Sequence, residues 1–95
     1  MPKAYLVAHI RVHDKEKFEE FKAMSGPAIQ QYGGRVLARN PAPDHREGDL
    51  RGLNILIEFD SMDRAREFYE SPEYTAAKTV REQAAQTDLM LVEGL

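Results

Sequence analysis

The sequence contains two successive copies of one plan, and this repetition constrains the fold more than any other feature. Residues 4–40 and residues 52–94 each pass from an alternating apolar stretch through an amphipathic helix to a second stretch with strand character. Two such halves in a row predict an α+β domain of order β-α-β-β-α-β, with a four-stranded antiparallel sheet and helices on one face. Because 95 residues have room for one such core, we expect residues 1–95 to form a single domain.

Two segments alternate with the period of two that marks a half-buried strand. In residues 4–12 the purely apolar set is Ala4, Leu6, Ala8, Ile10 and Val12, and the opposite set is Tyr5, Val7, His9 and Arg11. In residues 53–59 the apolar set is Leu53, Ile55, Ile57 and Phe59, and the opposite set is Asn54, Leu56 and Glu58. Weaker patterns predict strands over residues 35–39 and 88–93. The purely apolar sets are expected to face the helices.

Capping residues and apolar stripes predict the helices. Asp14 and Ser61 stand where N-caps are expected, and Gly33-Gly34 ends the first helix. Pro27 follows Gly26 inside that helix, so we expect a kink or a break there. Ser71-Pro72 breaks the second helix and starts another, whose stripe consists of Tyr74, Ala77, Val80, Arg81 and Ala84. Together these signals predict the ferredoxin-like form of the domain, which leaves one face of its sheet without helices.

Residues 40–51 form a polar connection that contains two prolines and a glycine. It is long for a hairpin, and long loops in compact domains are often functional or mobile. His45 lies there with Asp44 and Asp49, but no helical or hairpin spacing fixes these side chains and no second histidine is near. We therefore predict no metal site.

Composition argues against several classes of partner. The net charge is −3 and no basic cluster follows a phosphate backbone, so nucleic acid is not an expected partner. There are no cysteines, which removes disulfides and thiolate chemistry and fits a reducing compartment. The N-terminus shows no cleavage site and is too short to span a bilayer, so we expect no membrane partner and a cytoplasmic location.

Several short runs occur in an order that resembles one small bacterial family, the domain of unknown function DUF1330. These runs are Tyr32-Gly33-Gly34-Arg35, Glu47-Gly48-Asp49, Glu58-Phe59-Asp60-Ser61, Phe68-Tyr69-Glu70-Ser71-Pro72-Glu73-Tyr74 and Leu91-Val92-Glu93-Gly94. The resemblance covers nearly the whole chain. It departs from the usual pattern at Leu50, where relatives often carry tryptophan, and at Asn40-Pro41, which replaces a frequent Gly-Gly.

The family is similar to dimeric α/β-barrel proteins, in which two ferredoxin-like sheets pack face to face with the helices outside. The resemblance therefore implies a homodimer that forms through the open face of the sheet. Relatives of this kind include antibiotic-biosynthesis monooxygenases, which act without a cofactor, as well as isomerases and haem-degrading enzymes. We accordingly expect no cofactor, and the resemblance indicates architecture more firmly than chemistry.

The open sheet face carries the first group of candidate residues. If the strands of residues 4–12 and 53–59 are the central pair, then His9, Arg11, Asn54 and Glu58 lie close together in the middle of the sheet. A histidine beside a carboxylate is a candidate base, and arginine can hold a carboxylate or enolate. We assign His9, Arg11 and Glu58 as candidate catalytic residues, with Tyr5 and Asn54 binding substrate. The alternative is a polar dimer interface cross-linked by Arg–Glu pairs.

Tyr69 and Tyr74 form the second group, because aromatics at helix ends can floor a pocket and a phenol can donate to a bound carbonyl. The alternative is that they anchor the core. Arg81 could reach the same region. The alternative, which we favour, is that Arg81 occupies a solvent-exposed position on its helix.

Two functions are compatible with these residues. The first is a cofactor-independent enzyme that acts on a small organic substrate by proton transfer or monooxygenation. The alternative is a non-catalytic module that binds or senses a small molecule, with affinity from Tyr69 and Tyr74. A plain structural domain would have a collapsed interior with no ligand-sized cavity.

Overall fold

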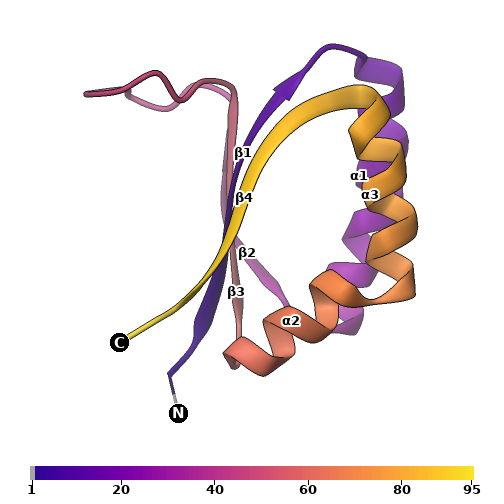
Figure 1. Cartoon of the computed structure of the whole chain (residues 1–95), viewed down its shortest axis with the longest axis vertical. Helices are drawn as coiled ribbons and strands as arrows, with labels where there is room; N and C mark the ends of the chain where they lie inside the picture. The colour runs from indigo at the N-terminus through magenta and orange to yellow at the C-terminus, as the bar shows by residue number, and fades with distance from the viewer. Residues whose placement is uncertain (1) are drawn as a thin grey trace.

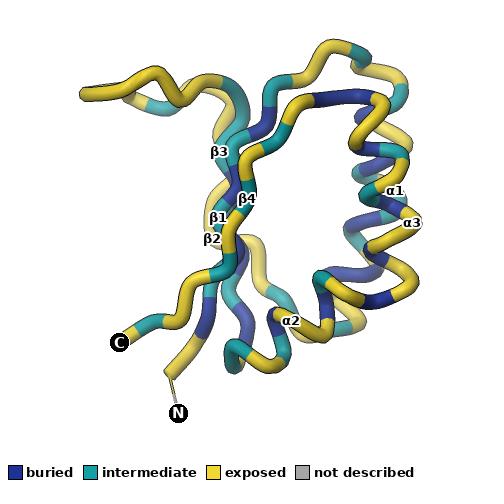
Figure 2. Tube along the Cα trace, in the orientation of Figure 1, coloured by how far each residue is buried: buried dark blue, intermediate teal, exposed yellow. Residues whose placement is uncertain are grey.

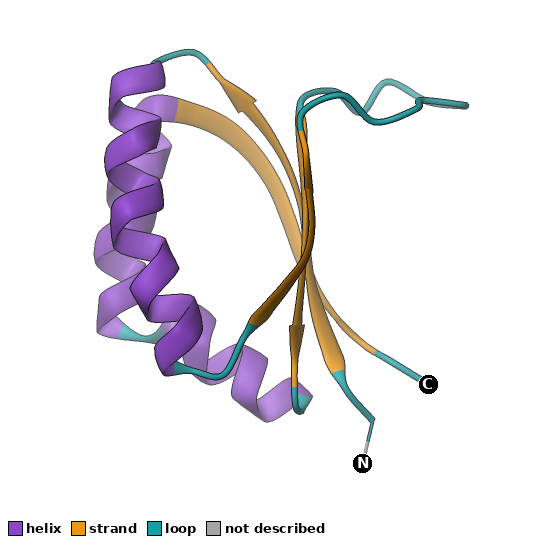
Figure 3. Ribbon diagram, turned by 180° about the vertical axis from the view of Figure 1, so that it is seen from behind, coloured by secondary structure: helices purple, strands orange, loops and turns teal. Residues whose placement is uncertain are grey.

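The computed structural model describes residues 2–95, which form a sheet layer and a helix layer (Figure 1). The elements in chain order are β1 (Ala4–Val12), α1 (Lys15–Gln31), β2 (Arg35–Asn40), β3 (Leu53–Phe59), α2 (Met62–Glu70), α3 (Pro72–Ala84) and β4 (Ala85–Glu93). From the opposite side, α1 and α3 lie side by side against one face of the sheet, and no helix of residues 2–95 covers the other face (Figure 3). The predicted α+β architecture is therefore confirmed. None of the helices within residues 2–95 combines the length and the apolar composition needed to cross a membrane.

The strand order is β2-β3-β1-β4, and all neighbouring strands are antiparallel. This order places β1 and β3 at the centre, as the sequence predicts. β1 pairs along its whole length with β4, from Ala4 opposite Glu93 to Val12 opposite Ala85. A shift in register between Val36 and Ala38 marks a bulge on the edge strand β2.

The core lies between the sheet and the helices, where the alternation of β1 and β3 directs their apolar sets (Figure 2). Ala4, Leu6, Ala8 and Ile10 are all buried, whereas the residues between them are half-buried. An aromatic cluster fills the end of the core near α2. In it the Phe68 ring centroid lies 5.1 Å from that of Phe59 and 4.5 Å from that of Tyr74.

The predicted caps are confirmed in detail. The side chains of Asp14 and Ser61 accept hydrogen bonds from the backbone N–H groups of Lys17 and Arg64 at the starts of α1 and α2. Ser71 ends α2 and caps α3, and its hydroxyl oxygen accepts from the Tyr74 N–H at 3.0 Å. Each cap satisfies a backbone donor that the helix itself leaves without a partner.

Two local expectations differ from the structure. α1 runs through Pro27 without the break that was one of the two expected outcomes, because the proline ring lies on the exposed side while Ala28 and Ile29 next to it are buried. β4 begins at Ala85, directly after α3, rather than at residue 88. The Ala84 carbonyl at this junction accepts from the N–H groups of His13 and Asp14, which fixes the turn without any loop residue.

Candidate functional site

The register of the sheet arranges the side chains of the open face in rows, because directly paired residues of neighbouring strands point to the same side. One polar row crosses all four strands and consists of Asn40, Asn54, His9 and Asp88. The next row is apolar and consists of Ala38, Leu56, Val7 and Met90. A third row consists of Arg35, Glu58, Tyr5 and Val92.

This register separates His9 from Glu58, which the sequence analysis placed together. His9 pairs with Asn54, and Glu58 lies four residues further along β3, about 13 Å away at the rise of a strand. The carboxylate beside His9 is instead Asp88, on β4. The His9 Nδ1 atom is buried and has no hydrogen-bond partner within residues 2–95. The open face thus holds a His9–Asn54–Asp88 group and a separate group around Glu58.

Arg11 belongs to the first of these groups. Its Nη1 atom lies 3.1 Å from the Asp88 Oδ2 atom, so Arg11 forms an ion pair with Asp88 rather than with Glu58. Both side chains are partly exposed, which leaves this pair weak while the face is open to water.

Glu58 lies in an ion-pair network at the other end of the face. Its carboxylate accepts from Arg35 Nε at 3.0 Å and from the Tyr5 hydroxyl at 3.2 Å. The Arg35 guanidinium also donates to Asp60, which accepts from Lys3 as well. Hydrogen bonds from Arg35 hold the pKa of Glu58 and the pKa of Asp60 below their ordinary values of 4.5 and 3.8. Both carboxylates are therefore ionised at neutral pH, which suits an ion-pair network better than proton uptake.

This network predicts a pH-dependent effect of the substitution Arg35→Gln. Lowered carboxyl pKa values stabilise the folded chain fully above the ordinary values, and the stabilisation is lost as pH falls through the lowered values. We expect the variant to have a lower melting temperature than the wild type at neutral pH, and the difference should shrink as pH falls below the ordinary carboxyl pKa values of 4.5 and 3.8. Thermal melts across that range measure it. If the difference in melting temperature between the variant and the wild type is the same at every pH, Arg35 acts through packing alone.

Tyr69 and Tyr74 lie on the helix side of the sheet and do not meet the open face. The Tyr74 side chain is 4% exposed and packs on Phe21, Phe68 and Tyr69. The structure therefore does not bring the two predicted groups into one site. The sheet separates Tyr74 from Tyr5, His9, Arg11, Asn54 and Glu58.

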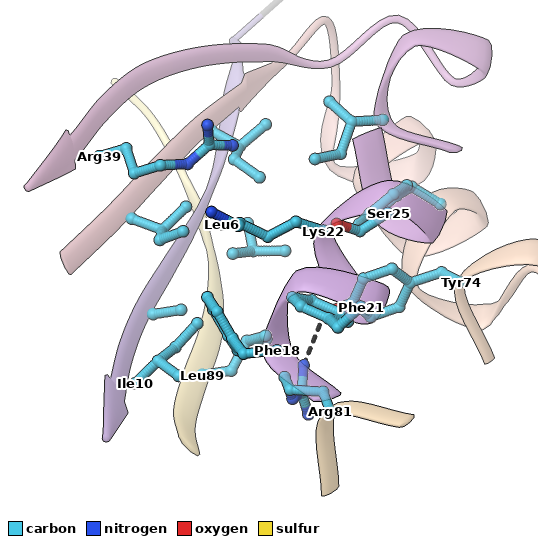
Figure 4. Close-up of a pocket in the computed structure, with 15 residues that line it drawn as sticks. Leu6, Ile10, Phe18, Phe21, Lys22, Ser25, Arg39, Tyr74, Arg81 and Leu89 are labelled. Carbon is cyan, nitrogen blue, oxygen red and sulfur yellow. Dashed lines mark hydrogen bonds between the residues drawn. The ribbon is translucent and has the colours of Figure 1, made fainter. Parts of the chain in front are cut away.

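A cavity of about 30 Å³ lies on the same side as Tyr74, between the sheet and α1 and α3 (Figure 4). Apolar side chains from β1, β3, β4, α1 and α2 form most of its wall. Its polar lining residues are Lys22, Ser25, Arg39, Tyr74 and Arg81. A shallow groove of about 380 Å³ adjoins the cavity along β2 and α1, and Phe18, Lys22 and Arg39 line both spaces. The groove gives the cavity a side that faces solvent.

Arg81 is the functional candidate that sequence reasoning undervalued. It is 6% exposed rather than solvated, and its Nη1 atom donates to the Tyr74 hydroxyl oxygen at 2.6 Å. Its Nε atom is buried and has no hydrogen-bond partner among the described residues. The sequence could have predicted this burial, because Arg81 lies on the apolar stripe of α3 and must be buried together with the apolar residues of that stripe.

Tyr74 and Arg81 form a pair with defined donor and acceptor roles. Burial raises the pKa of Tyr74 above its ordinary value of 10.0, although the charge of Arg81 acts in the opposite direction. The phenol is therefore protonated at neutral pH. Since Arg81 donates to the phenol oxygen, the phenolic hydrogen is available for another acceptor. The pair offers a fixed positive charge and a hydroxyl donor to a group inside the cavity.

The loop of residues 41–52 contributes to neither group. Most of its residues are exposed, and Asp44 forms an ion pair with Arg46 at 2.9 Å. In the part of the chain that the structure describes, no group of three or more His, Cys, Asp or Glu residues is placed to hold a metal ion.

Comparisons with known proteins agree with this architecture. The model of the family described as "Domain of unknown function (DUF1330)" matches residues 3–95. A comparison with curated proteins finds no match.

Three of the solved structures that are similar to this chain illustrate the match. A protein of unknown function from Rhodopseudomonas palustris has a TM-score of 0.81 at 18% identity, covering 99% of this chain and 83% of its own. SnoaB from Streptomyces nogalater, described as a cofactor-independent oxygenase, has a TM-score of 0.71 at 13% identity, covering 96% of this chain and 91% of its own. A dimeric protein of unknown function with a ferredoxin-like fold from Bacteroides fragilis has a TM-score of 0.62 at 15% identity, covering 96% and 95%. At these identities the similarity shows that the fold is shared.

Proposed function

This chain belongs to the DUF1330 family, and from that premise we propose that it is a small cofactor-independent enzyme acting on a small organic substrate. The observation that carries the proposal is the groove of about 380 Å³ along β2 and α1, which adjoins the small cavity that contains the Tyr74–Arg81 pair. The fold shared with SnoaB, a cofactor-independent oxygenase, supports the class of reaction. The cytoplasm remains the expected location.

The proposed chemistry is stabilisation of an anionic intermediate. Proton transfer and oxygenation without a cofactor both begin when the substrate loses a proton, here to water in the open groove, and becomes an enolate or phenolate. Oxygenation then takes dioxygen as the oxidant. A fixed guanidinium in an apolar cavity stabilises such an anion strongly, because little water screens the charge. Arg81 would supply that charge, and the Tyr74 hydroxyl would donate a hydrogen bond to the oxyanion.

We further propose that two copies of the chain pair through the open sheet face. The apolar row through Val7 crosses the middle of that face, and a second copy would cover it. The loop of residues 41–52 projects from the sheet on the side away from the helices, where a partner would lie (Figure 1). The dimeric Bacteroides fragilis protein shares this fold. His9, Arg11 and Glu58, with Tyr5 and Asn54, would then face the dimer interior as a second candidate site.

One observation favours a binding or sensing module instead. Among the described residues, the wall of the cavity contains no aspartate, glutamate or histidine, so it holds no obvious proton acceptor. A ligand could be bound there through Arg81 and the apolar wall without being converted. In this second candidate function, Tyr74 would provide affinity and His9 would be dispensable.

The test measures two readouts on a panel of hydroxyaromatic and 1,3-dicarbonyl compounds: dioxygen uptake and incorporation of solvent deuterium. We expect Tyr74→Phe to reduce turnover by about 100-fold or more, since loss of one hydrogen-bond donor to an oxyanion costs about 10²–10³-fold. Tyr69→Phe is the matched control, because Tyr69 contacts the Tyr74 ring but does not line the cavity.

His9→Ala separates the two candidate sites. It should retain turnover if the cavity is the active site. Loss of turnover in a folded His9→Ala dimer, with Tyr74→Phe active, would instead place the chemistry on the sheet face. Binding without dioxygen uptake or deuterium incorporation would identify the protein as a binding module.

A further inference from the structure

We infer that the groove along β2 and α1 binds an amphipathic organic anion, whose acidic group lies between Arg39 and Lys22 and whose apolar body covers the floor of the groove. The inference rests on the proposed function in one respect, because it takes the groove to be the place where the substrate binds. Three observations support it, and they concern the size of the groove, the charges that line it and the apolar floor between those charges.

The first observation is that the groove is large enough for a small organic molecule and is open to one. Its volume is about 380 Å³, within the range of about 300–1,000 Å³ that is typical of ligand pockets. β2 is exposed along its whole length, so a ligand can enter the groove directly from solvent. A ligand therefore needs no part of the small cavity next to the groove.

The second observation is that the groove holds more positive than negative charge. Arg39 and Lys15 are exposed, and neither forms an ion pair with another residue of 2–95. Lys22 is the third base, and it pairs at 3.0 Å with Glu19, which is the only acid among the described lining residues. The whole chain has a net charge of −3, so this groove is a local positive site on an acidic protein, which favours the approach of an anion.

Two of these bases converge on one space. Arg39 is opposite the buried residue Ile55 in the register of β2 and β3, so its side chain points to the helix side of the sheet. Figure 4 shows the charged ends of Arg39 and Lys22 extending toward one another from β2 and α1. Like charges that face each other repel. An anion between them would remove this repulsion and accept charge-assisted hydrogen bonds from both side chains.

The third observation is the apolar floor. The remaining residues that line the groove are Val12, Phe18, Pro41 and Leu53. Val12 is 38% exposed, so part of this apolar surface is in contact with water in the free protein. An inorganic anion would leave that surface exposed, whereas the apolar body of an organic anion would cover it, and the burial of apolar surface is favourable. The floor therefore favours an organic anion over inorganic phosphate.

The experiment compares an acid with its own amide, using naphthoate and naphthamide in calorimetric titrations of the wild-type protein. At low salt we expect naphthoate to bind at least about fivefold more tightly, because exposed ion pairs are individually weak and two unpaired bases contribute here. The difference should shrink as sodium chloride is added, since salt screens exposed charges. Equal affinity for the two compounds, or no binding of naphthoate, overturns the inference.

Two variants should change the affinity for naphthoate in opposite directions. Arg39→Gln should remove most of the preference for the acid. Glu19→Gln should strengthen the binding of naphthoate by up to about fivefold, because it frees Lys22 from an exposed ion pair. Arg66→Gln is the matched control, since Arg66 lies on α2 and lines neither the groove nor the cavity. An unchanged preference in Arg39→Gln, or weaker binding of naphthoate by Glu19→Gln, contradicts the inference.

These outcomes are distinct from those that test the proposed function. Naphthoate that binds through Arg39, in a protein that shows no turnover of any compound, would contradict the enzyme and leave this inference standing. Turnover of neutral compounds by a protein without a preference for acids would support the enzyme and overturn the inference.

Discussion

Replacing Val7 with aspartate is expected to leave a folded monomer where the wild-type chain forms a dimer. Val7 lies in the central strand β1, between Leu56 and Met90 in the apolar row of the open face. In the proposed dimer a partner sheet covers this row, so each protomer would bury one aspartate without a counter-ion. An uncompensated buried charge costs about 3–5 kcal/mol, so the dissociation constant should rise by at least about 100-fold.

Native mass spectrometry measures the outcome directly, because the monomer has a mass of 10.8 kDa and the dimer twice that. Val36→Asp is the matched control: Val36 is also a strand valine, 42% exposed, but it pairs with Ile57 on the helix side of the sheet. We expect this control to remain a dimer. A wild-type monomer, or a Val7→Asp dimer as stable as the wild type, would show that the open face is not the interface.

The dimer test also bears on the residues first assigned to catalysis. If the open face is covered, the unpartnered Nδ1 of His9 and the Arg11–Asp88 pair are enclosed with a second copy of themselves. The side chains of His9, Arg11 and Asp88 would then either form a polar part of the dimer interface or line an enclosed site. In the monomer of Val7→Asp the Arg11–Asp88 pair beside His9 stays open to water, so any activity that needs an enclosed sheet face should be lost together with the dimer.

The sequence predicts the sheet well because its strongest signal is local. The period of two in β1 and β3 gives both strands their observed bounds and assigns each side chain to the correct face. The sequence is less informative where tertiary contacts determine whether a helix continues or where a strand begins. Pro27 lies in an unbroken helix because its neighbours are buried, and β4 starts at Ala85 because the pairing with Val12 continues to the end of α3.

The candidate site could be predicted only in part, for a physical reason. Alternation tells which face a residue is on but not which residues of two strands are opposite each other, and the register separates His9 from Glu58. The position of Arg81 on the α3 stripe was visible in the sequence. Only the packed structure shows that no carboxylate of the described residues pairs with Arg81.

Replacing Phe68 with alanine is expected to destabilise the folded chain by about 3–5 kcal/mol, as large-to-small substitutions of buried aromatics do. Phe68 is fully buried, and its ring contacts those of Phe59, Tyr74 and Tyr32. Because small domains are stable by about 5–15 kcal/mol, this loss is a large fraction of the total. Urea unfolding at one fixed protein concentration measures it, since the stability of a dimer depends on concentration.

Phe68→Leu provides the control, because it keeps an apolar side chain and leaves a smaller void, so it should cost much less than the alanine variant. Phe68 also lines the cavity, so its truncation should widen the space next to Tyr74 and Arg81. A folded Phe68→Ala protein should therefore admit bulkier apolar compounds than the wild type does. A Phe68→Ala protein that unfolds at the same urea concentration as the wild type would contradict the role of Phe68 as a core anchor.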